Sequence, residues 1–388
     1  MSKIMDLDKE YIASTYNRYP VCFVKGEGSI LYDEDGKRYV DMSSGIAVNS
    51  FGIADEKWQQ AVISQVGKLQ HVSNLYYSEP CVKAAELLCG KSGMKKVFFC
   101  NSGTESNEAA IKVARKYAAE KKGEDYYTII TLENSFHGRT LAALAATGQE
   151  ELHQTFKPMM AGFIHTPAND KEALMEAVKN NKIAAIMIEC VQGEGGVMKL
   201  DDDFIKCIAG ICEKEDILMI CDEVQTGNGR SGYMYAYQGF GVQPDVATTA
   251  KGLAGGLPIG AVLLGEKVKN VFVGGDHGAT FGGNLISCAA ACSILERLDD
   301  VFFASVREKS EYCFKEFEGA EGIEAVDGMG LMIGLKTIKP AADIINECLK
   351  HGVVCLPAHG RVRLLPALNI PQELLAEAVS IIKEVCKA

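Results

Sequence analysis

Three separate segments of the sequence carry side chains that suit the binding of one small ligand. The first is Ser102-Gly103-Thr104, which lies between a short apolar run and a helical pattern. Small residues at a helix N-terminus leave free backbone N–H groups at the positive end of the helix dipole, which favours a phosphate. Plain capping of the helix by the hydroxyl side chains explains the same residues equally simply.

The second and third segments each place one ionisable side chain beside an apolar run. Asp222 directly follows the run at 217–221, where a buried carboxylate must be paired or hydrogen-bonded. Lys251 lies in DVATTAKGLAGGLPIG, between small residues and glycines. It is either a surface residue or a partly desolvated amine, and desolvated amines are typical Schiff-base formers. Taken alone, a structural ion pair and an exposed lysine remain open as explanations.

One cofactor explains the three segments together. A phosphate site, a carboxylate for a pyridine nitrogen and an amine for an aldehyde are what pyridoxal phosphate requires. In that chemistry Asp222 keeps the ring nitrogen protonated, so that the ring draws electrons from the substrate. Lys251 binds the aldehyde and, once the substrate has displaced it, moves the proton. The sequence therefore predicts Asp222 and Lys251 as catalytic residues.

These segments need a scaffold that brings them to one place. Between about residues 96 and 265, amphipathic helical patterns alternate with short apolar runs: VFFC (97–100), YTIIT (127–131), IAAIMIE (183–189), ILMIC (217–221) and IGAVLL (259–264). This alternation is typical of an α/β fold with a mainly parallel sheet covered on both faces. In such sheets ligands bind beyond the carboxyl ends of the strands, next to the segments described above.

The two chain ends predict a second, smaller unit. SILY and KRYVDM flank the turn former Asp33-Glu34-Asp35-Gly36 and predict an N-terminal hairpin. Beyond about residue 285 the pattern is more helical and charged, and an amphipathic helix follows Pro371. We expect a large domain of residues 46–290 and a small α+β domain formed by 1–45 and 291–388.

The composition argues against several other classes of protein. The 388 residues include 40 Lys and Arg against 51 Asp and Glu, so a net charge of −11 gives no general attraction for nucleic acid or an anionic membrane. The 14 cysteines form no Cys-x-x-Cys pair, and the seven histidines form no i, i+4 pair. We expect no metal site, reduced thiols and a cytoplasmic location. Three cysteines close to the site segments should be buried strand residues behind the ligand: Cys100, Cys190 and Cys221.

The sequence resembles the class III (ornithine-type) pyridoxal phosphate aminotransferases, and most closely the acetylornithine aminotransferases of arginine biosynthesis. The motifs that carry this resemblance are GIAVN (45–49), HVSNLYYSEP (71–80), NSGTESNEAAIKVARKY (101–117), SFHGRTLAALAATGQ (135–149), QGEGG (192–196), DEVQTGNGR (222–230), PDVATTAKGLAGGLPIGA (244–261), TFGGN (280–284) and GMGLMIG (328–334). The resemblance implies a fold-type I pyridoxal phosphate transferase. It also implies a homodimer with shared active sites, in which Thr280 reaches the phosphate of the neighbouring subunit.

The resemblance further implies how the cofactor is held. Ser102-Gly103-Thr104 would hold the phosphate, in agreement with the helix-terminus argument. Phe136 would stack on the pyridine ring, with His137 beside it and Val224 on the other ring face. Gln225 would hydrogen-bond the ring hydroxyl. Without the motifs, Phe136 and Val224 would simply be core residues.

Two arginines indicate the substrate class by the same resemblance. Arginine binds carboxylates well because its donors form a fork. Arg139 would bind the α-carboxylate of acetylornithine or the distal carboxylate of glutamate, and Arg363 the α-carboxylate of glutamate or 2-oxoglutarate. Glu194 would pair with Arg363 while an ω-amino donor occupies the site. Ala279 replaces the Ser or Thr that relatives often carry on the substrate side, so one hydroxyl that would reach the substrate is lost.

We therefore expect transfer of the δ-amino group of N-acetylornithine to 2-oxoglutarate, giving N-acetylglutamate 5-semialdehyde and glutamate. Ornithine, succinylornithine, succinyldiaminopimelate and 4-aminobutyrate stay open as donors, because one sequence does not show which residues line the donor's tail. A dinucleotide-dependent oxidoreductase lacks its glycine fingerprint here and leaves Lys251 and Asp222 unexplained. A non-catalytic regulatory module is disfavoured because no DNA-binding segment is visible.

Overall fold

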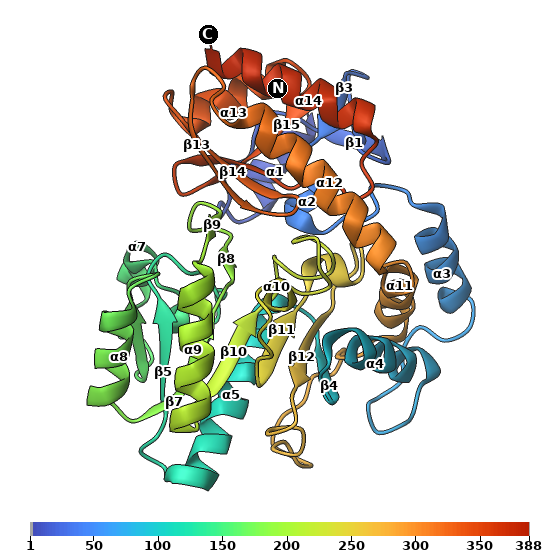
Figure 1. Cartoon of the computed structure of the whole chain (residues 1–388). Helices are drawn as coiled ribbons and strands as arrows, with labels where there is room; N and C mark the ends of the chain where they lie inside the picture. Colours follow the sequence, from blue (N-terminus) through green and yellow to red (C-terminus); the bar gives the residue numbers. More distant parts are fainter. Residues whose placement is uncertain (1–2, 388) are drawn as a thin grey trace.

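The computed structural model describes residues 3–387, and its largest element is a seven-stranded sheet of order β4-β12-β11-β10-β7-β5-β6 (Figure 1). The strands are β4 (Lys96–Cys100), β5 (Thr128–Leu132), β6 (Phe163–Thr166), β7 (Ile183–Ile188), β10 (Leu218–Asp222), β11 (Val246–Thr249) and β12 (Gly260–Leu264). All pairs are parallel except those of β12, which is antiparallel to both neighbours. Residues 250–259 join β11 to β12 and are too few for a crossover helix, so the chain turns straight back.

Successive side chains of the central strand β7 enter two different cores. Ala185 and Met187 belong to the core that includes residues of α5 (Gly103–Lys122). Ile186 and Ile188 belong to the core on the other face, with residues of α9 (Asp202–Glu215). All six residues of this strand are buried. Helices therefore cover both faces of the sheet, and the predicted α/β fold class is confirmed.

Shorter elements complete this part of the molecule. Figure 1 shows α4 and α11 beside the β4 edge of the sheet, and α11 contacts both α3 and α4. The remaining helices and the small hairpin are α2 (Ser44–Ala47), α3 (Glu56–Val66), α4 (Glu79–Ser92), α6 (Leu141–Ala146), α7 (Glu150–His153), η1 (Gln154–Phe156), α8 (Lys171–Asn180), β8 (Val191–Gln192), β9 (Met198–Lys199), α10 (Ala236–Gly239), η2 (Lys251–Leu253) and α11 (Leu285–Leu295).

The C-terminal part forms an antiparallel sheet of order β13-β14-β17-β16 with three helices. Its elements are α12 (Asp300–Phe317), β13 (Ile323–Met329), β14 (Met332–Thr337), α13 (Ala341–Lys350), β15 (Val353–Val354), β16 (Leu356–Ala358), β17 (Arg361–Leu364) and α14 (Gln372–Lys387). The helix predicted after Pro371 is confirmed as α14. Apolar residues of the three helices and of this sheet share one core.

The N-terminal segment lies against this C-terminal part (Figure 1). It contains α1 (Lys3–Tyr11), β1 (Phe23–Glu27), β2 (Ile30–Asp33) and β3 (Arg38–Asp41). The predicted hairpin is confirmed, because β2 and β3 are antiparallel neighbours. β3 pairs in parallel with β15, and Val40 and Met42 enter the C-terminal core. The domain boundaries at residues 46 and 290 stay a prediction.

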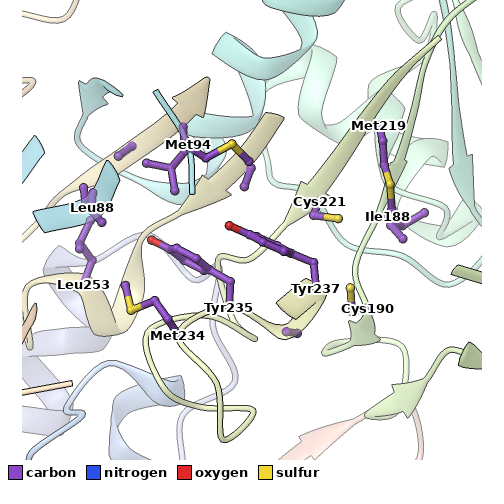
Figure 2. Close-up of a cluster of buried hydrophobic side chains, with 14 of the residues drawn as sticks. Leu88, Met94, Ile188, Cys190, Met219, Cys221, Met234, Tyr235, Tyr237 and Leu253 are labelled. Carbon is purple, nitrogen blue, oxygen red and sulfur yellow. The ribbon is translucent and has the colours of Figure 1, made fainter. Parts of the chain in front are cut away.

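Two of the three cysteines near the site segments end strands of the large sheet. Cys100 ends β4 and Cys221 lies in β10, and both are buried, as predicted. Cys190 is buried too, but it lies between β7 and β8, so the prediction of a strand position was wrong for it. Figure 2 shows Cys190 and Cys221 near the stacked rings of Tyr235 and Tyr237. Within residues 3–387, no helix has the length and apolarity to cross a bilayer.

Candidate active site

A cavity of about 370 Å³ lies where β4, β5, β10 and β11 end at their carboxyl edge. This volume falls in the range of roughly 300–1,000 Å³ that is usual for small-molecule sites. The structure brings nine of the predicted site residues into its lining: Ser102, Gly103, Thr104, Phe136, His137, Asp222, Val224, Gln225 and Lys251. The other five do not line it: Arg139, Glu194, Ala279, Thr280 and Arg363.

The N-terminus of α5 combines helix capping with free amides. Ser102 is the N-cap, and its Oγ accepts a hydrogen bond from the Glu105 amide at 3.2 Å. The amides of Gly103 and Thr104 belong to the first turn, where a helix offers its N–H groups no internal partner. A Cβ on Gly103 would lie 2.6 Å from Val224 Cγ1, so only glycine lets Val224 come this close. Capping and anion binding are therefore compatible at this terminus.

Asp222 is held in place by several donors. Its Oδ2 accepts hydrogen bonds from Asn107 Nδ2 at 2.7 Å and from His137 Nδ1 at 2.8 Å, and its Oδ1 accepts one from the Val224 amide at 3.0 Å. Burial alone would lower the pKa of His137, but the hydrogen bond to Asp222 and the negative charges of Asp222 and Glu189 together outweigh it, so the pKa is raised. The carboxylate is buried yet well supplied with donors, which fix its orientation.

Lys251 begins η2, directly beyond the end of β11. Its φ of 44° lies in the left-handed region, which is a strained conformation for a residue other than glycine. Its Nζ has no hydrogen-bond partner within residues 3–387. Desolvation lowers the pKa of this amine; Glu194 opposes the shift, and the positive charge of Arg363 adds to it. The lysine is therefore closer to its nucleophilic, neutral form than a free lysine is.

Glu194 and Arg363 meet beside the cavity although they come from different parts of the fold. Glu194 lies in the turn between β8 and β9, and Arg363 lies on β17 of the C-terminal sheet. Arg363 Nη2 donates to Glu194 Oε2 at 3.1 Å, and Nη1 donates to Gln225 Oε1 at 3.1 Å. Burial raises the pKa of Glu194, but the guanidinium of Arg363 outweighs it, so the pKa is lowered. Gln225 thus connects this ion pair to the cavity lining.

Arg139 and the segment around Thr280 lie farther from the lining. The Arg139 guanidinium carbon is 5.3 Å from the ring centroid of Phe136, so this exposed arginine sits next to a lining residue. Asn74 Nδ2 donates to the carbonyl oxygen of Ala279 at 3.1 Å, and Thr280 is exposed. The structure of one chain does not bring Ala279 or Thr280 to its own cavity.

Glu189 and Asn107 are among the lining residues that were not predicted. Glu189 accepts hydrogen bonds from the Phe136 amide at 2.8 Å and from the Gly193 amide at 3.0 Å, so it joins the segment after β5 to the turn between β8 and β9. Burial raises the pKa of this carboxyl to about 7. The position of an acid directly after the apolar run of β7 could have pointed to Glu189. Asn107 lies within α5 and gave no such signal.

A larger cavity of about 840 Å³ lies at the opposite edge of the sheet, near the starts of β7 and β10. Its basic residues are Lys122, Lys179 and Lys214. Each lies in the last turn of a helix, where a positive charge offsets the negative end of the helix dipole. These lysines therefore have a structural explanation, and the smaller cavity is the candidate site.

Comparisons with known proteins agree with this geometry. A family model described as aminotransferase class-III matches residues 11–386. The acetylornithine aminotransferase of Haemophilus ducreyi is 49% identical over 385 residues, which cover 99% of this chain and 98% of the relative. That of Caldanaerobacter subterraneus is 44% identical, covering 97% of this chain and 98% of the relative.

Solved structures give the same result. An ornithine aminotransferase from Toxoplasma gondii matches with a TM-score of 0.94 and 28% identity, covering 99% of this chain and 94% of that one. The N-acetylornithine aminotransferase from Stenotrophomonas maltophilia has a TM-score of 0.86 and 33% identity, and the match covers 98% of both chains. The chain belongs to the class III aminotransferases. The family, the fold class and the enzyme class expected from the sequence are confirmed.

Proposed function

We propose that this cavity binds pyridoxal phosphate and that the enzyme transfers the δ-amino group of N-acetylornithine to 2-oxoglutarate. The products would be N-acetylglutamate 5-semialdehyde and glutamate. The observation that supports this best is the convergence of Asp222, Lys251 and the N-terminus of α5 on one cavity. When bound, the cofactor supplies an electron sink for the substrate carbon that loses a proton.

The donor set of the cavity fits this cofactor. The first-turn amides of α5 and the hydroxyl of Thr104 suit the phosphate. Asp222 suits a protonated ring nitrogen, because it is a buried carboxylate acceptor held in place by three donors. Phe136 and Val224 offer apolar surface for the two ring faces, and the Gln225 amide suits the ring hydroxyl.

Lys251 would have two tasks. Its amine, with a lowered pKa, would attack the aldehyde carbon and anchor the cofactor. Once the substrate amine has taken that position, Nζ would accept the proton from the substrate carbon and return it at the next step. The small residues around Lys251 would keep bulk water away from this transfer.

The charged groups beside the cavity support an ω-amino donor and an α-keto acid acceptor. Arg139 would bind the α-carboxylate of acetylornithine. Glu194 would neutralise Arg363 while this donor is bound, and Arg363 would bind the α-carboxylate of the keto acid once Glu194 has moved aside. The names of the relatives from Haemophilus ducreyi and Stenotrophomonas maltophilia support acetylornithine as the donor.

We also propose a homodimer with shared sites in the cytoplasm. Large apolar side chains are exposed within the motifs at 71–80 and 280–284, namely Leu75, Tyr76, Tyr77 and Phe281. Such a surface suits a subunit interface. Thr280, exposed and remote from its own cavity, would then reach the phosphate bound in the partner. The 14 free cysteines fit a reducing compartment.

Absorbance of the purified enzyme tests the proposal directly. The holoenzyme should be yellow, should lose that band on addition of acetylornithine and should regain it with 2-oxoglutarate. Lys251→Ala should reduce kcat at least about 1,000-fold, and turnover by this variant at close to the wild-type rate would overturn the mechanism. Comparing kcat/KM for acetylornithine, ornithine, succinylornithine, succinyldiaminopimelate and 4-aminobutyrate tests the donor. A tenfold preference for 4-aminobutyrate would contradict the substrate assignment.

A further inference from the structure

Asn107 is a buried residue of α5 whose amide faces the carboxylate of Asp222. Its side chain is 1% exposed, although asparagine is more often found at surfaces. Nδ2 donates to Asp222 Oδ2 at 2.7 Å and to the carbonyl oxygen of His137 at 2.7 Å. Both hydrogens of the amide group are therefore used, and one of them reaches a residue far away in the sequence.

Thr248 fixes the orientation of this amide. Thr248 Oγ1 lies 2.8 Å from Asn107 Oδ1 and 3.4 Å from Asp222 Oδ1. A hydroxyl has one proton, and the shorter contact takes it. Turning the amide over would place Oδ1 against two further acceptors, Asp222 Oδ2 and the His137 carbonyl. Only one orientation of Asn107 satisfies all of these groups.

The two oxygens of Asp222 differ in how many hydrogen bonds they accept. Oδ2 already accepts from Asn107 and from His137 Nδ1, so both of its lone pairs are occupied. Oδ1 accepts from the Val224 amide at 3.0 Å and receives no proton from Thr248. One acceptor site on Oδ1 is therefore left for a further donor.

We propose that Asn107 is a positioning residue that holds the carboxylate of Asp222 so that Oδ1 faces the ring nitrogen of the cofactor. This inference rests on the proposed function. Asn107 adds a donor to Oδ2 without adding a charge, so it holds the carboxylate and leaves Oδ1 available to the ring N–H. Thr248 acts on Asp222 mainly through Asn107, because its own contact with Oδ1 is the longer one, at 3.4 Å.

Cofactor binding to the apoenzyme tests this inference without relying on turnover. The probes are pyridoxal phosphate and an analogue in which a C–H group replaces the ring nitrogen. Asn107→Ala should weaken binding of pyridoxal phosphate at least about tenfold, since a hydrogen bond to a charged group is lost. The same substitution should change binding of the analogue less than twofold, because the analogue has no ring N–H for Asp222. An equal loss for both probes would show a merely structural role and overturn the inference.

Thr248→Val provides the second test, because valine keeps the shape and removes the hydroxyl. Alone, it should weaken pyridoxal phosphate binding by a few-fold. In the Asn107→Ala background its effect should be smaller than in the wild type, since the route through Asn107 is gone and only the 3.4 Å contact with Asp222 Oδ1 remains. If the effects of the two substitutions on cofactor binding multiply in full, the inference is overturned. Failure of the wild-type apoenzyme to bind pyridoxal phosphate would instead refute the proposed function, so the two failures are distinguishable.

Discussion

Arg363 and Glu194 form an ion pair with two contacts across the interior of the molecule, with Nη2 and Oε2 3.1 Å apart and Nη1 against Oε1. Arg363 is only 3% exposed, so its charge is costly to leave unpaired. Any substrate carboxylate that binds Arg363 must therefore displace Glu194. This relationship links the choice of substrate to the movement of one side chain.

Neutralising Glu194 should change which substrate the enzyme prefers. With Glu194→Gln, Arg363 keeps its charge but loses its counter-ion, so substrates with a carboxylate at this position gain. We expect the ratio of kcat/KM for acetylornithine to that for glutamate to fall by about tenfold, a change of about 1.4 kcal/mol. Single-turnover absorbance measures both half-reactions. Asp327→Asn is the matched control, because Asp327 pairs with Arg361 nearby at 3.7 Å. An unchanged ratio in Glu194→Gln would contradict the switch.

The buried carboxyl of Glu189 should make the free energy of unfolding fall as the pH rises. Burial raises the pKa of the Glu189 carboxyl from its ordinary value of 4.5 to about 7 in the folded protein. Between these values the folded protein holds a proton that the unfolded chain has lost, so the contribution to stability is greatest at low pH and disappears as the pH rises through 7. Glu189→Gln does not titrate. The urea midpoint of the wild-type apoprotein minus that of the variant should therefore fall from pH 5 to pH 8, because only the wild type loses stability through this group.

Glu223 is the matched control for Glu189. It is buried, and burial raises its pKa to about 7 as well, but it does not line the cavity. Glu223→Gln should show the same trend of stability with pH. Only Glu189→Gln should change the absorbance of the bound cofactor, because only Glu189 joins the loops of Phe136 and Gly193. A pH-independent difference for Glu189→Gln would refute this assignment.

The exposed apolar surface around Tyr77 should be required for dimer formation. Tyr77 is fully exposed in the single chain, and Tyr77→Glu would place a charge in the proposed interface. We expect this variant to be mainly monomeric by light scattering and to lose most of its activity. Ile338→Glu serves as a control, because Ile338 is 71% exposed but lies beyond β14. A dimeric Tyr77→Glu protein would place the interface elsewhere.

Thiol labelling should distinguish the cysteines by burial. Cys207 and Cys212 lie on the same helix, α9, but Cys212 is buried and Cys207 is partly exposed. Burial also raises the pKa of the Cys212 thiol, which lowers its fraction of thiolate. In the folded holoenzyme Cys207 should react at least about 100-fold faster than Cys212, since a buried thiol reacts only after local opening. Mass spectrometry should find Cys100, Cys190 and Cys221 among the slow group, and fast labelling of all three would contradict the packing described here.

Most of the large sheet was predictable because its strands are short, apolar and separated by helices. The runs that became β7 and β10 are buried on both faces, so their composition alone marks them. β6 and β11 were missed. The FIHT segment of β6 is only partly buried and reads as a loop. The VATT segment of β11 is buried, but it is short and half of it is threonine. The reversal of β12 has no compositional signal, since a strand shows the same side chains in either direction.

The site was predictable where a motif marked it and not where partners are far apart in the chain. Asp222 ends β10 and Lys251 lies just beyond β11, so their place at the sheet edge follows from topology. Asn107 lies 115 residues from Asp222, and nothing in its own segment shows that contact. Ala279 and Thr280 act, in the proposed dimer, on another chain, so no single chain tests their roles.

The direction of β12 has a consequence for how the molecule assembles. β12 pairs with β11 on one side and with the distant β4 on the other, and a Cβ on Gly260 would lie 2.3 Å from the Ser102 carbonyl oxygen. The loop of Lys251 and the N-terminus of α5 therefore meet only when β12 has paired with both β11 and β4. A partly folded chain would have both halves of the site and no ligand pocket. The cofactor would thus bind only the finished sheet, and would delay its unfolding without guiding its formation.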